Sequence, residues 1–205
     1  LAAQSFLKEY PVKVIHNGID IDDFKPIKSD FRQRFGVGNK KMVLAVASVW
    51  GRGKGLYDVI RLPELLGKDY VVVMVGLNDE QKKELPPEII GITKTNSVRE
   101  LAEIYSAADV FVNFTYADNY PTVNLEAQCC DTPVITYRTG GSIESVPEGQ
   151  IVSCGDIAAA ADEIRDICEN GNYVIMNREI FDKRRAGREY IELYKAMLGS
   201  KKRKI

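Results

Sequence analysis

Short apolar runs alternate with amphipathic segments along most of the chain, and this alternation restricts the possible folds more than any other feature. The runs predict strands at 42–48, 70–75, 88–93, 109–113, 133–136 and 149–152, and the segments between them predict helices at 54–66, 97–107, 121–130, 156–170 and 178–198. Most runs are continuously apolar, which suits strands buried on both faces of a parallel sheet. We expect an α/β fold, a Rossmann-like, doubly wound sheet of six parallel strands in the order 3-2-1-4-5-6.

Helix-start signals and apolar stripes support this reading. Ser97 and Asp156 stand where the N-caps of two helices are expected, and Glu100 follows Ser97 at the spacing of a capping box. Apolar stripes are expected at Leu56, Val59, Ile60 and Leu65 in one helix, at Ile157, Ala160, Ile164 and Ile167 in another, and at Tyr190, Leu193, Tyr194 and Met197 in the last.

The length of 205 residues leaves one or two domains open. The strand count favours one: an entry segment at 1–40 with a short strand at 12–15, a core at 41–175 and C-terminal helices at 176–205. The chain begins with Leu1 rather than Met, without the pattern of a signal peptide, so we expect a segment of a longer protein.

Composition excludes several classes of function. The net charge of -1 argues against a nucleic-acid binder, and no apolar run reaches the length of a membrane span. Four cysteines without CxxC spacing and a single histidine, His16, do not make a zinc site, so we expect buried, reduced thiols in a cytoplasmic protein. The basic run at 201–204 is interpreted as a solvated chain end rather than a membrane-binding patch.

In a doubly wound sheet of this order, ligands bind where strands one and four end. The loop after strand one, Trp50-Gly51-Arg52-Gly53-Lys54-Gly55, is neither a Walker loop nor a dinucleotide fingerprint. Helix-start amides with Lys54 and Arg52 could hold an anion there. The alternative is a flexible surface loop with solvated cations.

The loop after strand four runs from Asp118 to Glu126 through Asn119, Tyr120, Pro121, Thr122 and Val123. A phosphate at this helix start, with a carboxylate on each side to accept hydrogen bonds from vicinal hydroxyls, would make a sugar-nucleotide site. Taken singly, Asp118 could be a cap and Glu126 a solvent-facing residue. Gly140 and Gly141, after strand five, allow either close approach to a ligand or a tight turn.

Further short motifs occur in order along the chain. They are Val14-Ile15-His16-Asn17-Gly18-Ile19-Asp20 with Phe24 and Pro26, Lys54-Gly55, Ala108-Asp109-Val110-Phe111-Val112, the pair Asp118 and Glu126, Thr132-Pro133-Val134-Ile135, and Gly140-Gly141 with Glu144. Together they resemble the C-terminal, donor-binding domain of a GT-B-fold glycosyltransferase. The family resembled is the large retaining family-four type, or glycosyl transferases group 1, which includes bacterial capsule and lipopolysaccharide enzymes.

The resemblance implies a role for each site residue. Glu126 would accept hydrogen bonds from the ribose, and Asp118 would contact the donor sugar. Lys54 would stabilise the diphosphate with amides from Tyr120 to Val123, and the base would lie near Thr93. The sequence departs from the family at two positions: the first acid is usually Glu, and Val49 stands where an Arg is usual, so Arg52 would supply the second cation.

The implied reaction is transfer of a sugar, with retention of configuration, from a nucleotide sugar, UDP- or GDP-linked, to a saccharide or lipid-linked acceptor. No cofactor and no metal are expected, because a lysine, an arginine and a helix N-terminus can stabilise the leaving diphosphate. The acceptor site would lie on an N-terminal domain absent from this chain, so the chain alone should be inactive. The whole protein is expected in the cytoplasm, with peripheral membrane association possible. Alternatives are a GT-B-type nucleotide-sugar epimerase and a non-catalytic nucleotide-sensing module.

Overall fold

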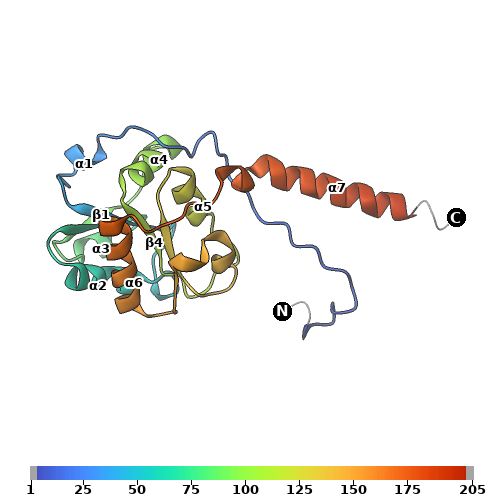
Figure 1. The fold of residues 1–205 in the computed structure, drawn as a ribbon, viewed down its shortest axis with the longest axis horizontal. Helices are drawn as coiled ribbons and strands as arrows, with labels where there is room; N and C mark the ends of the chain where they lie inside the picture. The colour runs from blue at the N-terminus through green and yellow to red at the C-terminus, as the bar shows by residue number, and fades with distance from the viewer. Residues whose placement is uncertain (1–3, 202–205) are drawn as a thin grey trace.

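The computed structural model describes residues 4–201, and its centre is one parallel sheet (Figure 1). The strands are β1 (Lys41–Val46), β2 (Tyr70–Val75), β3 (Ile89–Ile92), β4 (Val110–Asn113), β5 (Val134–Tyr137) and β6 (Ile151–Val152). Their order is β3-β2-β1-β4-β5-β6, so the predicted fold and strand order are confirmed. β1 pairs with β2 on one side and with β4 on the other, which places the reversal of strand order between β1 and β4.

Helices connect the strands. They are α1 (Phe31–Arg34), α2 (Leu56–Leu66), α3 (Asp79–Lys83), α4 (Val98–Ala107), α5 (Thr122–Cys129), α6 (Ile157–Arg165) and α7 (Lys183–Lys201). Shorter turns are η2 (Arg52–Lys54), η3 (Ser142–Ser145), η4 (Glu148–Gln150), the π-helical η5 (Asp166–Asn170) that prolongs α6, and η6 (Arg178–Phe181). The predicted caps form: Ser97 accepts from the Glu100 amide (3.1 Å) and Asp156 from the Ala159 amide (3.0 Å).

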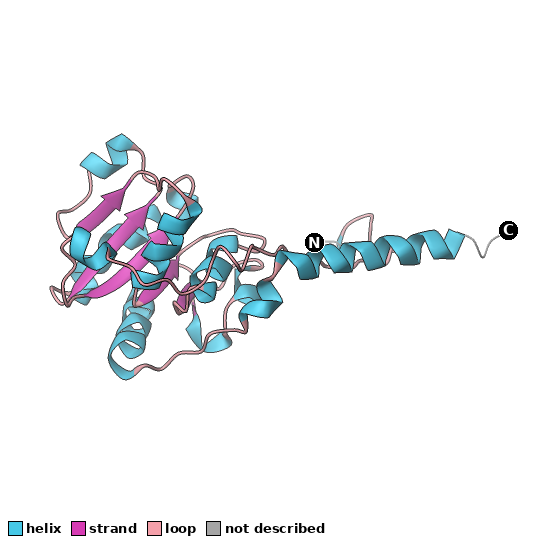
Figure 2. Ribbon diagram, turned by 90° about the horizontal axis from the view of Figure 1, so that it is seen from above, coloured by secondary structure: helices cyan, strands magenta, loops and turns pink. Residues whose placement is uncertain are grey.

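The sheet is buried on both faces, as its continuously apolar strands require. On one face, α2 and α6 pack on alternate residues of β1, β2 and β4, such as Val43, Val72 and Val110. On the other face, α4, α5 and residues 19–37 pack on the intervening residues, such as Leu44 and Val73. Figure 2 shows this layered core with α7 projecting away from it.

The entry segment and α7 meet at one corner of the core. Ile19 forms a parallel bridge with Asp182, its amide donates to the Phe181 carbonyl (2.8 Å), and its carbonyl accepts from the Lys183 amide (2.9 Å). A Cβ at Gly18 would lie 2.5 Å from Lys183 Cα, so this close approach of the two backbones requires glycine. From this corner the segment before residue 18 and α7 both extend beyond the core (Figure 1).

Several local predictions were wrong. Residues 12–15 form no strand, and α1 and α3 were not predicted. In α2 the buried stripe includes Leu62 and Leu66, whereas Leu65 is 37% exposed. Cys154 is also exposed, in contrast to Cys129 and Cys130, whose pKa values burial raises to about 11 and about 12. The basic run at 201–204 lies outside the residues whose side chains are described.

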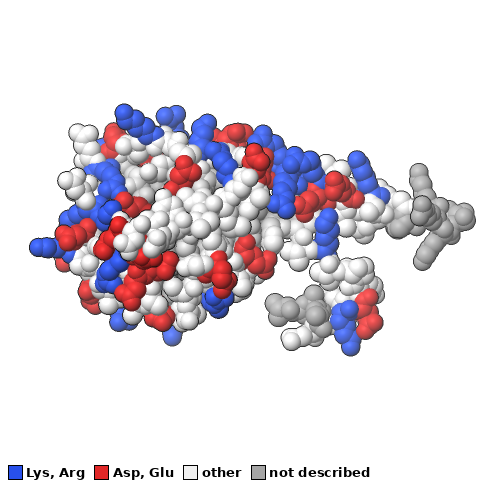
Figure 3. All heavy atoms as spheres, viewed as in Figure 1, with Lys and Arg blue, Asp and Glu red and all other residues white. Residues whose placement is uncertain are grey.

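Charges of both signs are interspersed over the face seen in Figure 3, and basic side chains gather at the beginning of α7. Between residues 4 and 201, no helix has both the length and the apolar character needed to cross a bilayer.

Candidate functional site

The loops after β1 and β4 meet, as the topology predicts. The Tyr116 amide donates to the Gly53 carbonyl (2.9 Å), which joins the two loops directly. Gly55 has φ +72°, and a Cβ there would lie 2.3 Å from the Phe114 carbonyl oxygen. Only glycine tolerates both this backbone conformation and this approach. The glycine-rich loop is therefore a tightly packed connection between β1 and α2 rather than a free surface loop.

This packing brings Lys54 against Asp118. Lys54 Nζ lies 2.7 Å from Asp118 Oδ2, and the side chains are 43% and 18% exposed respectively. The ammonium thus keeps access to solvent while its partner lies deeper. Arg52 is exposed and lines neither of the cavities described below, so its role as the second cation stays a prediction.

Gly140 and Gly141 pack against the backbone of the Asp118 loop. The Gly141 amide donates to the Asp118 carbonyl (3.0 Å). A Cβ at Gly141 would lie 1.7 Å from the Asn119 carbonyl oxygen, and one at Gly140, where φ is +45°, would lie 2.2 Å from the Asp118 carbonyl oxygen. The two glycines therefore admit the backbone of residues 118–119, and a contact of either glycine with a ligand stays a prediction.

A cavity of about 250 Å³, the first cavity, opens where these loops meet. Lys54, Asp118 and Tyr120 line it together with the beginning of α5 at Pro121, Thr122 and Val123. The first amides of a helix have no acceptor within the helix and carry partial positive charge. The first cavity thus combines an ammonium group, a carboxylate and a helix N-terminus. Asn119 is exposed and does not line it.

A second cavity, of about 450 Å³, continues from the first past the ends of β1 and β2. Both cavities are lined by Val46, Ala47, Ser48, Thr122 and Val123. The second also has Thr93, Lys94 and Thr95 after β3, and Glu126 on α5. Asp118 and Glu126 therefore lie towards opposite ends of one groove, with the helix N-terminus between them.

Glu126 is half-buried and held by Tyr105. Tyr105 Oη donates a hydrogen bond to Glu126 Oε2 (3.0 Å). Burial raises the pKa of Glu126 above its ordinary value, and hydrogen bonds from Tyr105 and Thr122 oppose the rise. Tyr105 itself is fully buried. Burial is the main cause that raises the pKa of its hydroxyl, and the contact with Glu126 raises that pKa further. Sequence reasoning did not find Tyr105, because it lies on α4 and reads as a core residue.

The raised pKa of Glu126 predicts a pH-dependent effect on stability. A carboxyl whose folded pKa exceeds its unfolded value of 4.5 stabilises the fold at low pH, and this contribution is lost as pH rises through the folded pKa. The free energy of unfolding of the wild type should therefore fall relative to that of Glu126→Gln as pH rises above 4.5. The fall should be about 1.4 kcal/mol for each unit of pKa shift. Urea denaturation of both proteins across this range measures it, and parallel pH profiles would contradict it.

A buried amide network holds α5 in place and was not predicted. Asn113, at the end of β4, donates to Asn124 Oδ1 (2.8 Å), and Asn124 donates to Ser145 Oγ (2.9 Å). Gln128 donates to the Ser145 carbonyl (2.7 Å). Buried amides of this kind are costly unless satisfied, and satisfied networks fix one arrangement. The network sets α5, and so Thr122 and Glu126, against the sheet.

Within the described part of the chain, no group of three or more His, Cys, Asp or Glu side chains could hold a metal ion. The charged groups that line this groove are the lysines Lys54 and Lys94 and the carboxylates Asp118 and Glu126, together with the partial charge at the start of α5.

Comparison with known proteins agrees with the geometry. The profile of the family described as glycosyl transferases group 1 matches residues 27–186, which is most of the chain. The chain belongs to this family. As a family member it is 27% identical over 177 residues to a D-inositol 3-phosphate glycosyltransferase of Corynebacterium jeikeium, covering 75% of this chain and 42% of the relative. It is 23% identical over 164 residues to the capsular polysaccharide biosynthesis glycosyltransferase CapM of Staphylococcus aureus, covering 74% and 43%.

Solved structures share the fold of this glycosyl transferases group 1 chain. HepE of Anabaena, crystallised with UDP-glucose, has a TM-score of 0.77 at 21% identity, covering 90% of this chain and 57% of HepE. The C-terminal domain of LpcC, a glycosyl transferase group 1 family protein of Francisella tularensis, has a TM-score of 0.60 at 20% identity, covering 73% and 87%. The chain spans less than half the length of the two curated relatives.

Proposed function

We propose that this chain is the donor-binding domain of a glycosyltransferase that moves a sugar, with retention, from a nucleotide sugar to a saccharide or lipid-linked acceptor. One observation carries the proposal. A single groove presents the Lys54–Asp118 ion pair, the N-terminus of α5 and the Glu126 carboxylate in sequence. This order of groups suits a sugar, a diphosphate and a ribose joined in a row.

Each part of the ligand has matching chemistry. The diphosphate lies over the amides at Thr122 and Val123 and beside the Lys54 ammonium, because helix N-termini and cations both favour anions. The ribose hydroxyls donate to Glu126, and the sugar hydroxyls donate to Asp118. The base occupies the second cavity near Thr93.

In the transfer step, negative charge grows on the departing diphosphate. The Lys54 ammonium and the α5 amides stabilise that charge without needing to reorganise, because both are already fixed by the loops around them. No metal or cofactor is part of the proposal. Most of the acceptor site lies outside this chain, so we expect the 205-residue chain to bind the nucleotide and to transfer nothing by itself.

Calorimetry tests the donor site directly. The chain is titrated separately with UDP, GDP and ADP, and then with the matching nucleotide sugars. UDP is the first choice, because HepE, which has the same fold, was crystallised with UDP-glucose. We expect binding of at least one nucleotide, and a further gain in affinity from the attached sugar. Absence of binding of all three at millimolar concentration would contradict the site assignment, and indifference to the sugar would favour a nucleotide-sensing module.

Replacing Glu126 by Ala should weaken nucleotide binding by about 1–3 kcal/mol, roughly 5- to 150-fold, because hydrogen bonds to a charged acceptor are lost. Isothermal titration of the variant measures the change. Glu163→Ala is a matched control, since Glu163 is a half-buried glutamate on α6 that lines neither cavity. Unchanged affinity in a folded Glu126→Ala protein would refute the ribose contact.

A further inference from the structure

A third cavity, of about 210 Å³, lies where the entry segment meets the beginning of α7. We call it the junction cavity, and define it by its polar and charged lining residues, which are joined by a few smaller or apolar neighbours: His16, Asn17, Tyr120, Glu144, Asp182, Arg185 and Glu189. Tyr120 also lines the first cavity, and it is the residue that the two cavities have in common. The loop that carries Tyr120 therefore borders both the first cavity and the junction cavity.

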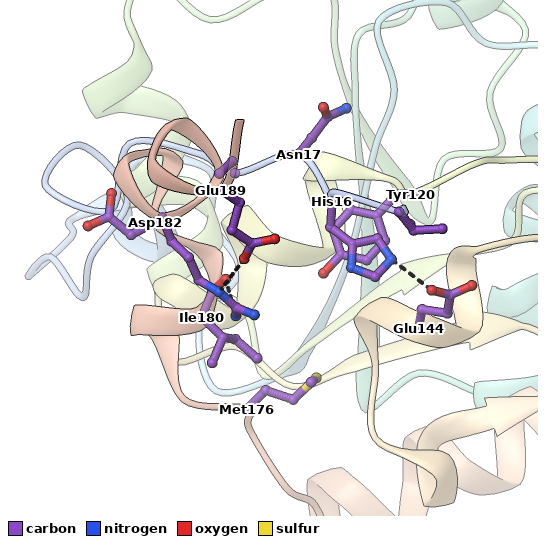
Figure 4. A pocket seen from close by; sticks show the side chains of 12 residues that line it. His16, Asn17, Tyr120, Glu144, Met176, Ile180, Asp182 and Glu189 are labelled. Carbon is purple, nitrogen blue, oxygen red and sulfur yellow. Dashed lines mark hydrogen bonds and ion pairs between the residues drawn. The ribbon is translucent and has the colours of Figure 1, made fainter. Parts of the chain in front are cut away.

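The wall nearest that loop is a pair of stacked rings. The His16 and Tyr120 ring centroids are 4.2 Å apart with an interplanar angle of 17°. His16 Nε2 lies 2.7 Å from Glu144 Oε2, which fixes the imidazole over the tyrosine. Figure 4 shows the two rings overlapping and the contact with Glu144. Such a pair provides a flat, partly apolar surface bordered by polar groups.

The charged groups of the junction cavity already have partners, and the partner of Asp182 is Arg184 (2.7 Å), which lies outside the cavity lining. His16 pairs with Glu144, and Arg185 Nε donates to Glu189 Oε1 (3.1 Å). An anionic ligand would meet three carboxylates, and a cationic ligand would meet Arg185 and carboxylates that already have partners. A neutral ligand that carries several hydroxyl groups meets neither obstacle, because each hydroxyl can donate to a carboxylate and accept from an N–H group.

We propose that the junction cavity is a saccharide subsite, which takes one neutral, hydroxyl-bearing ring. The ring packs against the His16–Tyr120 pair and exchanges hydrogen bonds with Glu144, Arg185 and Glu189. Resting on the proposed function, the subsite holds the part of the acceptor nearest the donor sugar, since Tyr120 belongs to both cavities. Tyr120 then contacts the donor in the first cavity and the acceptor ring in the junction cavity.

Amide chemical shifts of the ¹⁵N-labelled 205-residue chain test the subsite. D-glucose, D-galactose and D-mannose are titrated separately to high millimolar concentration, and UDP, GDP and ADP are titrated in parallel. At least one hexose should shift the amides at 16–18, Tyr120, Glu144 and 185–189. A nucleotide should instead shift those at 93–95 and 122–126. The two sets of amides separate the subsite from the donor site in one series of spectra.

Paired variants sharpen the test. Glu144→Gln should weaken hexose binding about tenfold, the scale of one hydrogen bond to a charged group, and leave nucleotide binding unchanged. Glu148→Gln is the control: it is an exposed glutamate on the neighbouring η4, paired with Arg138 (2.6 Å), and should change neither.

Three results would overturn the subsite: no shift with any of the hexoses, hexose shifts confined to the residues around Lys54 and Asp118, or equal hexose affinity in Glu144→Gln and wild type. If hexose shifts the junction amides while all nucleotides fail to bind, the subsite stands and the proposed donor site fails. The spectra also show whether each variant is folded.

Discussion

Replacing Lys54 by Met should weaken the binding of a nucleoside diphosphate by about 2 kcal/mol or more, roughly 30-fold. The substitution acts in two ways. It removes the cation that meets the phosphates. It also leaves the Asp118 carboxylate without the ammonium group that lies 2.7 Å away in the wild type, so that carboxylate faces the anion unpaired. Like charges brought this close in a partly desolvated site repel strongly. Isothermal titration with the diphosphate that the wild type binds best measures the loss.

A double substitution separates the two contributions. Adding Asp118→Asn to Lys54→Met removes the uncovered carboxylate, so it should restore part of the lost affinity, which additivity of independent sites would not predict. The nucleoside without phosphates should bind wild type and Lys54→Met alike. Lys68→Met, at an exposed lysine in the turn before β2, is the matched control. Full diphosphate affinity in Lys54→Met would remove Lys54 from the site.

Substitution of Gly141 by Ala should lower the free energy of unfolding by about 3 kcal/mol, the upper part of the range for overpacking. The new Cβ would lie 1.7 Å from the Asn119 carbonyl oxygen. This oxygen belongs to the backbone, so moving it away costs more free energy than moving the end of a flexible side chain. The Asp118 loop must therefore shift, and nucleotide affinity should fall together with stability. Urea denaturation and titration at a temperature where the variant remains folded measure both effects.

Gly149→Ala provides the control for Gly141→Ala. A Cβ at Gly149, on η4, would have no neighbouring atom within 4 Å, so the same chemical change should alter stability by no more than about 0.5 kcal/mol. If Gly141→Ala behaved like Gly149→Ala, the packing of the glycine pair under the Asp118 loop would not be what fixes that loop.

The sheet could be predicted from the sequence because its strands are short, apolar and separated by helical periods. The elements that the sequence did not predict are too short to show a periodic pattern of apolar residues. α1 and α3 have four and five residues, less than two turns, and so show no apolar stripe. Val12, Val14 and Ile15 are β-branched residues of the kind found in strands, but no neighbouring strand pairs with this segment, and Val12 and Val14 are exposed.

In the site, too, features with a local sequence pattern could be predicted, and contacts between residues far apart in the chain could not. The topology rule correctly brought the loops after β1 and β4 together, and the helix start with Glu126 was found from its own local pattern. The Lys54–Asp118 contact depends on the close approach of Gly55 to Phe114, which joins residues far apart in the chain. Arg52, at the beginning of η2, lines neither cavity, and the contact of Tyr105 with Glu126 depends on how α4 packs on α5. None of these has a local sequence signal.

The corner where Ile19 meets Asp182 determines how a force applied to the two extended segments would reach the core. A pull on the entry segment and on the far end of α7 would reach the core first through the two hydrogen bonds of Ile19, to Phe181 and Lys183, and not through the sheet. Tension along the entry segment would also act on His16, which lies against Tyr120. The loop that forms the first cavity is thus connected, through His16 and Tyr120, to the corner where the two extended segments meet.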